Sequence, residues 1–354
     1  MKKLVTDRPF TQFLVYHSPY LAVLAIFLWD VVCHRRILSG PIDISHLGLE
    51  QLRSPDNSSS ILIASYSELL MWISAMKLHV LLCFAGLIAA GVRLNNLYLD
   101  LERPLRNRIN LLGLGAALAL LPSIVYIFVV SHSSKHEYTE VYWVVHVLTS
   151  DRYEGVLPWI PWLDGLSVAT ALFLAAVASR VITPIVRPTD SLDRKIARVS
   201  VKLQTIRFLL YFGMVILVTN VVQTRAFLSI SLPHVKGSDA SARGDIEQVT
   251  KGTGEKTSDA QKNLTNVING LVTARGVLST CMLAAIFFPA TFFLREEAYK
   301  LAIEAKPEAP VSERESWLQE RGLIATVAEL IPRFAAVLAP LIAGPLSELI
   351  KRPS

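Results

Sequence analysis

Three side chains between residues 131 and 158 have a spacing that could bind a metal ion. His132, His136 and Glu140 lie four positions apart, so on a helix they project from one side, as ligands of one ion must. Imidazole and carboxylate groups suit zinc or iron. There is only one such histidine pair, and the other histidines are scattered through the chain. The simpler interpretation is a solvated helix on an outer face, and we predict no metal and no cofactor.

A second group of polar residues lies within or at the edges of long apolar stretches, where ionisable side chains mark functional sites by default. These residues are Asp30, Lys77, His79, Asp164, Asn220, Gln223, Arg225 and Arg275. Under the topology argued below, nearly all fall in the outer half of a bilayer. We interpret five of them as an outward-facing polar vestibule, which we predict to contain Lys77, His79, Asp164, Asn220 and Arg275. The alternative is that each charge extends its side chain to the outer membrane surface.

Two of these residues are not expected to share a site. Lys77 and His79 are two positions apart, so a helix directs them toward nearly opposite faces. Asp164, in contrast, shares one helix face with Ser167 and with a series of alanines, because the spacings are three and four. Small residues let helices approach closely, so this stripe predicts helix packing with a polar residue at one end.

No motif of an enzyme is present. The sequence has no Walker A loop and no GxGxxG, and it has no GxSxG or HExxH. We therefore expect a protein that acts without catalysis. An intramembrane enzyme that acts on lipid, with His79, Asp164 or the His132 group as its site, is the less favoured alternative.

The elements that carry these residues are six long apolar stretches. The chain has 354 residues, 52% of them hydrophobic and only 18% charged, and each stretch approaches the roughly 20 residues that a helix needs to cross a bilayer. The predicted spans are 13–32, 70–92, 111–130, 159–182, 208–225 and 271–294. The fold class is therefore all-α, a polytopic membrane bundle of six transmembrane helices with a C-terminal amphipathic or re-entrant segment.

The distribution of basic residues predicts which side each loop occupies. Segments 1–12, 93–110 and 183–207 hold 13 Lys and Arg in 55 positions, whereas 33–69, 131–158 and 226–270 hold 10 in 110. Cytoplasmic loops carry the excess of positive charge, so both termini are predicted to be cytoplasmic. The net charge of +6 is explained by this topology, and we predict no nucleic-acid partner.

Two polar regions lie outside the spans. Segment 230–262 is rich in Ser, Thr, Gly and charge and cannot bury enough apolar surface to fold alone, so we predict a mobile extracytoplasmic loop. Residues 295–354 are predicted to form a cytoplasmic charged helix and an amphipathic tail. Within this tail 323–350 contains Glu329, Arg333 and three prolines, and we predict that it lies on, or dips into, the cytoplasmic face. A seventh crossing by this segment is the alternative.

Taken together, the polar vestibule and the six spans predict a channel-like or ligand-responsive membrane component. A non-catalytic scaffold or assembly subunit is the alternative. The expected partners are the lipid bilayer and either a second copy or another membrane subunit. Short inner loops and only three cysteines favour a bacterial inner membrane.

Overall fold

The computed structural model describes residues 18–26, 59–98, 159–183, 190–232, 254–324, 332–333 and 335–342. The main helices are α4 (Ser59–Tyr98), α7 (Trp159–Ile182), α8 (Leu192–Ser229), α9 (Gly254–Ala305) and α10 (Val311–Glu320). Shorter helices occupy 18–26 and 335–342, and these described ranges contain no strand. The predicted all-α class is therefore confirmed.

Four helices, α4, α7, α8 and α9, are long and apolar enough to cross a membrane. The bounds of α7 coincide with the predicted span 159–182, and the other three helices enclose the spans 70–92, 208–225 and 271–294. Only 18–26 of the first predicted span is described, and 111–130 lies outside the described residues. Because α9 begins at Gly254, the end of the segment predicted as a loop, 230–262, is helical.

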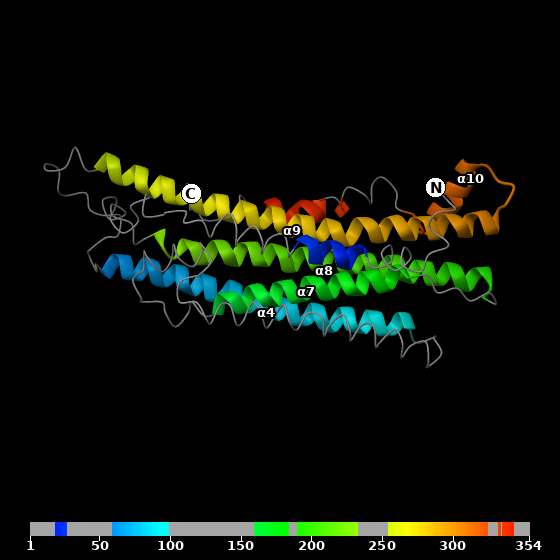
Figure 1. Cartoon of the computed structure of the whole chain (residues 1–354), viewed down its shortest axis with the longest axis horizontal. Coiled ribbons are helices and arrows are strands. Elements are labelled where there is room, and N and C mark those ends of the chain that lie inside the picture. The colour runs from blue at the N-terminus through cyan, green and yellow to red at the C-terminus, as the bar shows by residue number, and fades with distance from the viewer. Residues whose placement is uncertain are drawn as a thin grey trace.

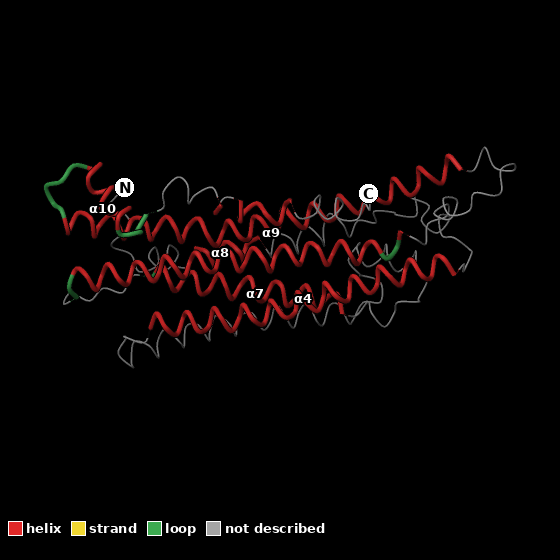
Figure 2. The backbone as a smooth tube through the Cα atoms, turned by 180° about the vertical axis from the view of Figure 1, so that it is seen from behind, coloured by secondary structure: helices red, strands yellow, loops and turns green. Residues whose placement is uncertain are grey.

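The four long helices form an elongated bundle in which α8 contacts each of the other three (Figure 1). The tube drawing shows the same side-by-side order from behind (Figure 2). Helices α4, α7 and α9 run in one direction along the bundle, and α8 runs in the opposite direction. Against α4, for example, Trp72 contacts Phe227, with ring centroids 5.6 Å apart, whereas His79 lies beside Thr219.

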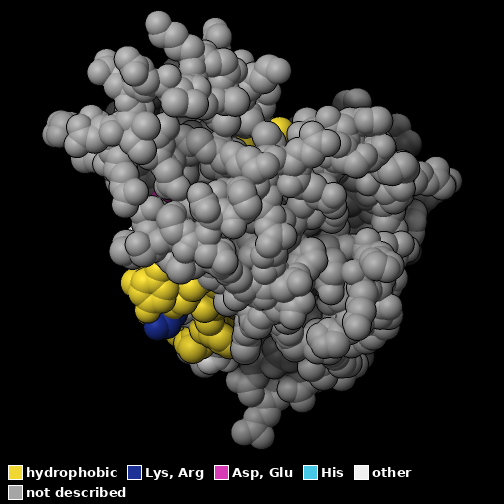
Figure 3. Space-filling model, turned by 90° about the vertical axis from the view of Figure 1, so that its left-hand side faces the viewer, with side chains coloured by type: hydrophobic (Ala, Val, Ile, Leu, Met, Phe, Trp, Pro, Cys, Tyr) yellow, Lys and Arg dark blue, Asp and Glu magenta, His cyan; other side chains and the backbone are white. Residues whose placement is uncertain are grey.

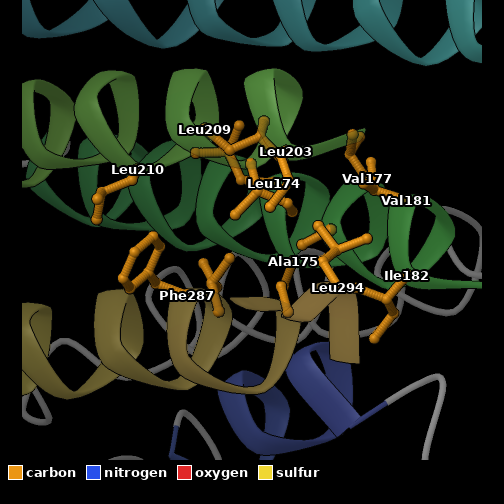
Figure 4. Close-up of a cluster of buried hydrophobic side chains, with 14 of the residues drawn as sticks. Leu174, Ala175, Val177, Val181, Ile182, Leu203, Leu209, Leu210, Phe287 and Leu294 are labelled. Carbon is orange, nitrogen blue, oxygen red and sulfur yellow. The ribbon is translucent and has the colours of Figure 1, made fainter. Parts of the chain in front are cut away.

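The largest apolar core occupies one half of this bundle. Its buried members come mainly from 171–182 of α7, 199–217 of α8 and 282–302 of α9, and Figure 4 shows leucines, valines and Phe287 from these helices meeting side by side. Two glycines permit close approach. A Cβ on Gly86 would lie 2.8 Å from Ile216 Cδ1, and one on Gly213 would lie 3.1 Å from Leu283 Cδ1. In a bilayer such close packing, rather than exclusion of water, holds helices together.

Helices α8 and α9 continue together beyond the predicted spans, joined by two ion pairs. Lys202 Nζ lies 2.9 Å and 3.1 Å from the two carboxylate oxygens of Glu297, and Lys195 Nζ lies 2.6 Å from Glu304 Oε1. The pairs are seven residues apart on each helix, so they occupy one seam about 10 Å long. Lys202 also donates to the carbonyl oxygen of Thr183 at 3.3 Å, which ties this seam to the end of α7.

The C-terminal part of the chain folds back onto α9. Tyr299 donates a hydrogen bond to Glu315 of α10, and Trp317 and Leu318 are buried. Further on, the helix 335–342 lies along the middle of α9. There a Cβ on Gly276 would come within 2.8 Å of the carbonyl oxygen of Pro340. The described part of the predicted amphipathic tail is thus packed against the outer half of the predicted span 271–294.

A buried polar layer as the candidate functional site

The most buried ionisable side chain in the described outer half of the bundle is His79 of α4, which has 0% exposure. Its Nε2 lies 2.7 Å from Ser167 Oγ of α7, and its Nδ1 lies 3.0 Å from Thr219 Oγ1 of α8. One imidazole therefore connects three helices. Cys83, one turn along α4, places its Sγ 3.5 Å from the same Nε2.

The hydroxyl groups around His79 are compatible with either protonation state of its ring. Ser167 Oγ also lies 2.8 Å from the carbonyl oxygen of Leu163, and Thr219 Oγ1 lies 2.8 Å from that of Ile216. If each hydroxyl donates its one hydrogen to its backbone carbonyl, both ring nitrogens must donate, which requires imidazolium. In neutral imidazole, one hydroxyl turns its hydrogen to the ring instead. The same heavy-atom arrangement can thus hold His79 with or without a second proton.

The polar level extends across the neighbouring helices. Asn220 follows Thr219 on α8 and accepts a hydrogen bond from Gln223 Nε2 at 3.1 Å. The pairs Lys202–Glu297 and Gly213–Leu283 fix the antiparallel register of α8 and α9. Continuing this register from Gly213–Leu283 places Thr219 and Asn220 within about one turn of Ser279 and Thr280 of α9. We call this set the polar layer, which consists of His79, Ser167, Thr219, Asn220, Gln223, Ser279 and Thr280.

The polar layer marks the outer boundary of the apolar core. Within the described parts of the four long helices, the buried core cluster contains residues only after 82 on α4, after 170 on α7, before 218 on α8 and after 281 on α9. Beyond the layer, toward the end predicted to be outside, buried polar groups occur beside further buried apolar residues such as Phe227, Leu228 and Ile268. Arg225 is buried and Arg275 is partly buried, and both side chains take part in further interactions.

Several buried acceptors in and beyond this layer have no hydrogen-bond partner among the residues that the structure describes. They include Gln223 Oε1, Asn269 Oδ1 and Thr280 Oγ1. Gln223 is only 4% exposed, so water reaches it only by entering between the helices. A buried polar atom without a partner is costly, and in native proteins ordered water usually satisfies it. The outer half of the bundle thus has acceptors suited to internal water.

The structure brings some of the predicted site residues together and separates others. His79 and Asn220 lie in the polar layer, and Arg275 lies about one turn of α9 outward from it. Lys77 is exposed on the outer surface of α4, on the opposite face from His79, as their spacing indicates. Asp164 lies one turn before Ser167 in α7, but its side chain is outside the described residues.

The structure does not test the predicted metal site. His132, His136 and Glu140 all lie outside the described residues. Among the residues that the structure does describe, no three His, Cys, Asp or Glu side chains are grouped to hold a metal ion. The sequence does not predict that Ser167 and Thr219 both contact His79. The position of Ser167 on the same helix face as Asp164 is visible in the sequence, whereas no pattern in the sequence singles out Thr219.

Replacing His79 with Leu is expected to lower the free energy of unfolding by about 1 kcal/mol, because intramembrane hydrogen bonds average roughly 0.6 kcal/mol each. Unfolding of purified protein in mixed micelles by added SDS measures this change. The variant Ser167→Ala, alone and combined with His79→Leu, gives the coupling energy. Fully additive effects would show that the 2.7 Å contact contributes nothing.

Known proteins offer no guide to this layer. No protein-family model, curated protein or solved structure matches the chain. The candidate function has to be argued from the layer's own chemistry, which is a histidine joined to hydroxyl and amide groups. These groups can bind water, a proton or a small polar ligand.

Proposed function

We propose that this protein is a six-span integral membrane protein that acts without catalysis as a channel-like or ligand-responsive component. In this proposal the outer half of the bundle is a hydrated polar vestibule. The polar layer forms its floor, and the apolar core below it is the closed inner half. The observation that carries the proposal is a set of buried acceptors on the outer side of that core that have no hydrogen-bond partner within the described part of the chain.

The directions of the helices support an even number of crossings. Helices α4 (to Tyr98) and α7 (from Trp159) run in the same direction along the bundle, so the chain has to return from the end of α4 toward the start of α7 (Figure 1). Within this connection, segment 111–130 has the length and apolar character for one crossing. Segment 13–32 would supply another, which gives six with the four long helices.

The orientation follows from charge. The first turns of α8 carry Arg194, Lys195, Arg198 and Lys202, and the excess of cations belongs on the cytoplasmic side. Both termini are then cytoplasmic, and a bacterial inner membrane remains the proposed location. The contact of Pro340 with Gly276 favours a C-terminal segment that enters the membrane beside α9 over one that rests on its surface.

Cysteine labelling tests the vestibule. In a chain whose three native cysteines are replaced by Ala, Gln223→Cys and Asn269→Cys are expected to react with a membrane-impermeant thiosulfonate added outside intact cells. Leu209→Cys and Leu283→Cys, from the apolar core, are the matched controls and are expected to stay unreacted. If the two outer positions resist labelling as completely as the core positions, the outer half is dry and the proposal fails.

Ion flux tests the channel-like role separately. Full-length protein is reconstituted in liposomes, and small polar compounds are added in turn to the side of the vestibule. The flux of at least one of H⁺, K⁺ or Cl⁻ is expected to rise above that of empty vesicles. A protein whose vestibule labels with thiosulfonate but which passes none of these ions would be a receptor or an assembly subunit. One observation favours an assembly role in addition, namely the exposed face of α4.

A further inference from the structure

The residues that the structure describes leave one face of α4 exposed along most of the helix. In the part of α4 that could span a membrane, Tyr66–Asn95, 22% of the residues in the most apolar window are buried, against 72% for α7. Exposed side chains recur at alternating steps of four and three, in the order Leu70, Ser74, Lys77, Leu81, Phe84 and Ile88. We call these six residues the α4 stripe.

The spacing of the α4 stripe is that of a helix-pairing seam. Steps of four and three average 3.5 residues, which keeps one line of side chains facing a partner helix over several turns. Leu81 and Ile88 are large apolar side chains, yet they are 65% and 68% exposed. End-on, hydrophobic side chains with a Lys or Arg among them are visible in the lower half of the molecule, the half in which Figure 1 places α4 (Figure 3).

An apolar stripe alone does not require a protein partner, because lipid tails cover it equally well. Lys77 makes the difference. It lies seven residues, or about 10 Å along the axis, from the outer end of the predicted span 70–92, and within the described residues it has no ion-pair partner. A cation at such a depth is costly against lipid and typically pairs with another group.

Charge complementarity limits the choice of partner. Two copies of this chain in one membrane have the same orientation, so pairing α4 with α4 would place Lys77 beside Lys77. The other predicted spans contain only two carboxylates, Asp30 and Asp164. Asp30 itself is outside the described residues, but the described helix of its span, 18–26, lies beside α9 on the side away from α4 (Figure 4). Asp164 belongs to α7, which packs against the His79 face of α4, the face opposite the α4 stripe.

We propose that the α4 stripe binds a transmembrane helix of another protein that carries an Asp or Glu at the depth of Lys77. Apolar residues at heptad spacing on that helix would pack against Leu70, Leu81, Phe84 and Ile88. The carboxylate would accept a hydrogen bond from the Lys77 ammonium and form an ion pair with it, which is strong in a medium of low dielectric constant. This inference does not depend on the proposed channel-like role.

A designed peptide tests the proposal. The probe is a synthetic Leu/Ala transmembrane helix with Glu at the depth of Lys77, and the same helix with Gln is its control. Fluorescence energy transfer between labelled peptide and full-length protein in phosphatidylcholine liposomes measures association. The Glu peptide is expected to bind at least about tenfold more tightly than the Gln peptide, a preference that Lys77→Met removes and Lys77→Arg keeps.

Three results would each overturn the proposal. Equal binding of the Glu and Gln peptides would show that lipid alone covers the stripe. A preference that appears only in the Asp164→Asn variant would show that Lys77 is paired within its own chain. Energy transfer between two labelled copies of the protein that is lost in Leu81→Ala/Ile88→Ala would assign the stripe to self-association. Because Lys77 is exposed, Lys77→Met is expected to fold, and its elution as a monodisperse peak confirms this.

Discussion

Replacing Glu297 with Met is expected to lower the free energy of unfolding by about 3–5 kcal/mol, the usual cost of removing one partner of a buried ion pair. The side chain of Lys202 is 2% exposed, whereas that of Glu297 is 29% exposed. Without Glu297, the ammonium keeps only the Thr183 carbonyl oxygen among the contacts described. The denaturation midpoint of purified protein, from SDS titration or a thermal melt, measures the loss.

Three comparisons separate this effect from a general loss of charge. Lys202→Met is expected to cost less, because the remaining carboxylate has access to water. The double variant Lys202→Met/Glu297→Met is expected to recover most of the stability, since an apolar pair often replaces a buried ion pair without loss. Glu304→Met breaks the exposed pair with Lys195 and should change stability by at most about 1 kcal/mol. Equal effects of Glu297→Met and Glu304→Met would contradict the burial argument.

Replacing Gly276 with Val is expected to detach the helix 335–342 from α9. A Cβ at this position meets the backbone of Pro340 and Leu341, at 2.8 Å from an oxygen and 3.1 Å from a Cα, and neither can turn away as a side chain could. Forcing extra atoms into a packed contact typically costs about 1–3 kcal/mol. Trypsin in mild detergent should therefore cut after Arg333, which is buried in the wild type, much faster in the variant.

Gly270 supplies the matched control for this experiment. It lies on the same helix, and a Cβ there meets nothing within 4 Å. Gly270→Val thus carries the same change in helix propensity without the clash. If both variants expose Arg333 at the same rate, the valine acts on α9 itself, and the docking of the C-terminal segment on Gly276 has no role.

The sequence alone predicts the position of the helices better than their length. The bounds of α7 were predicted without error, because its apolar stretch ends where the helix ends. Helices α8 and α9 extend well past 208 and 294 at the predicted inner end. Hydropathy could not find these extensions, because Lys202 and Glu297 count as polar in any window, although each stabilises the other in the fold.

The candidate site was predictable only in part, for a related reason. A histidine inside an apolar stretch is visible in the sequence, and so is the serine on the small-residue face of span 159–182. Their contact joins residues 88 positions apart, and nothing in either segment specifies the pairing. Thr219 is harder still, because threonine is common in apolar helices and can bond to its own backbone, as it does to Ile216. The vestibule stays a prediction, because the side chain of Asp164 lies outside the described residues.

The central position of α8 has a consequence for how this bundle could move. A helix that slides along its neighbours tends to settle one turn away, at about 5.4 Å, where its side chains again fit the facing grooves. For α8 both such positions are obstructed. A shift by one turn would put Leu209 or Leu217 in the place of Gly213, where even a Cβ would lie only 3.1 Å from Leu283 Cδ1.

The two polar contacts at the ends of α8 oppose sliding in opposite senses. Moved one way, α8 would present Ile206 to the carboxylate of Glu297. Moved the other way, it would present Val215 to the imidazole of His79. Each displacement strands one buried polar group, so α8 has a single axial position. Sliding of α8 along its axis is thus blocked, and motions of this bundle are expected to tilt or rotate the helices around α8.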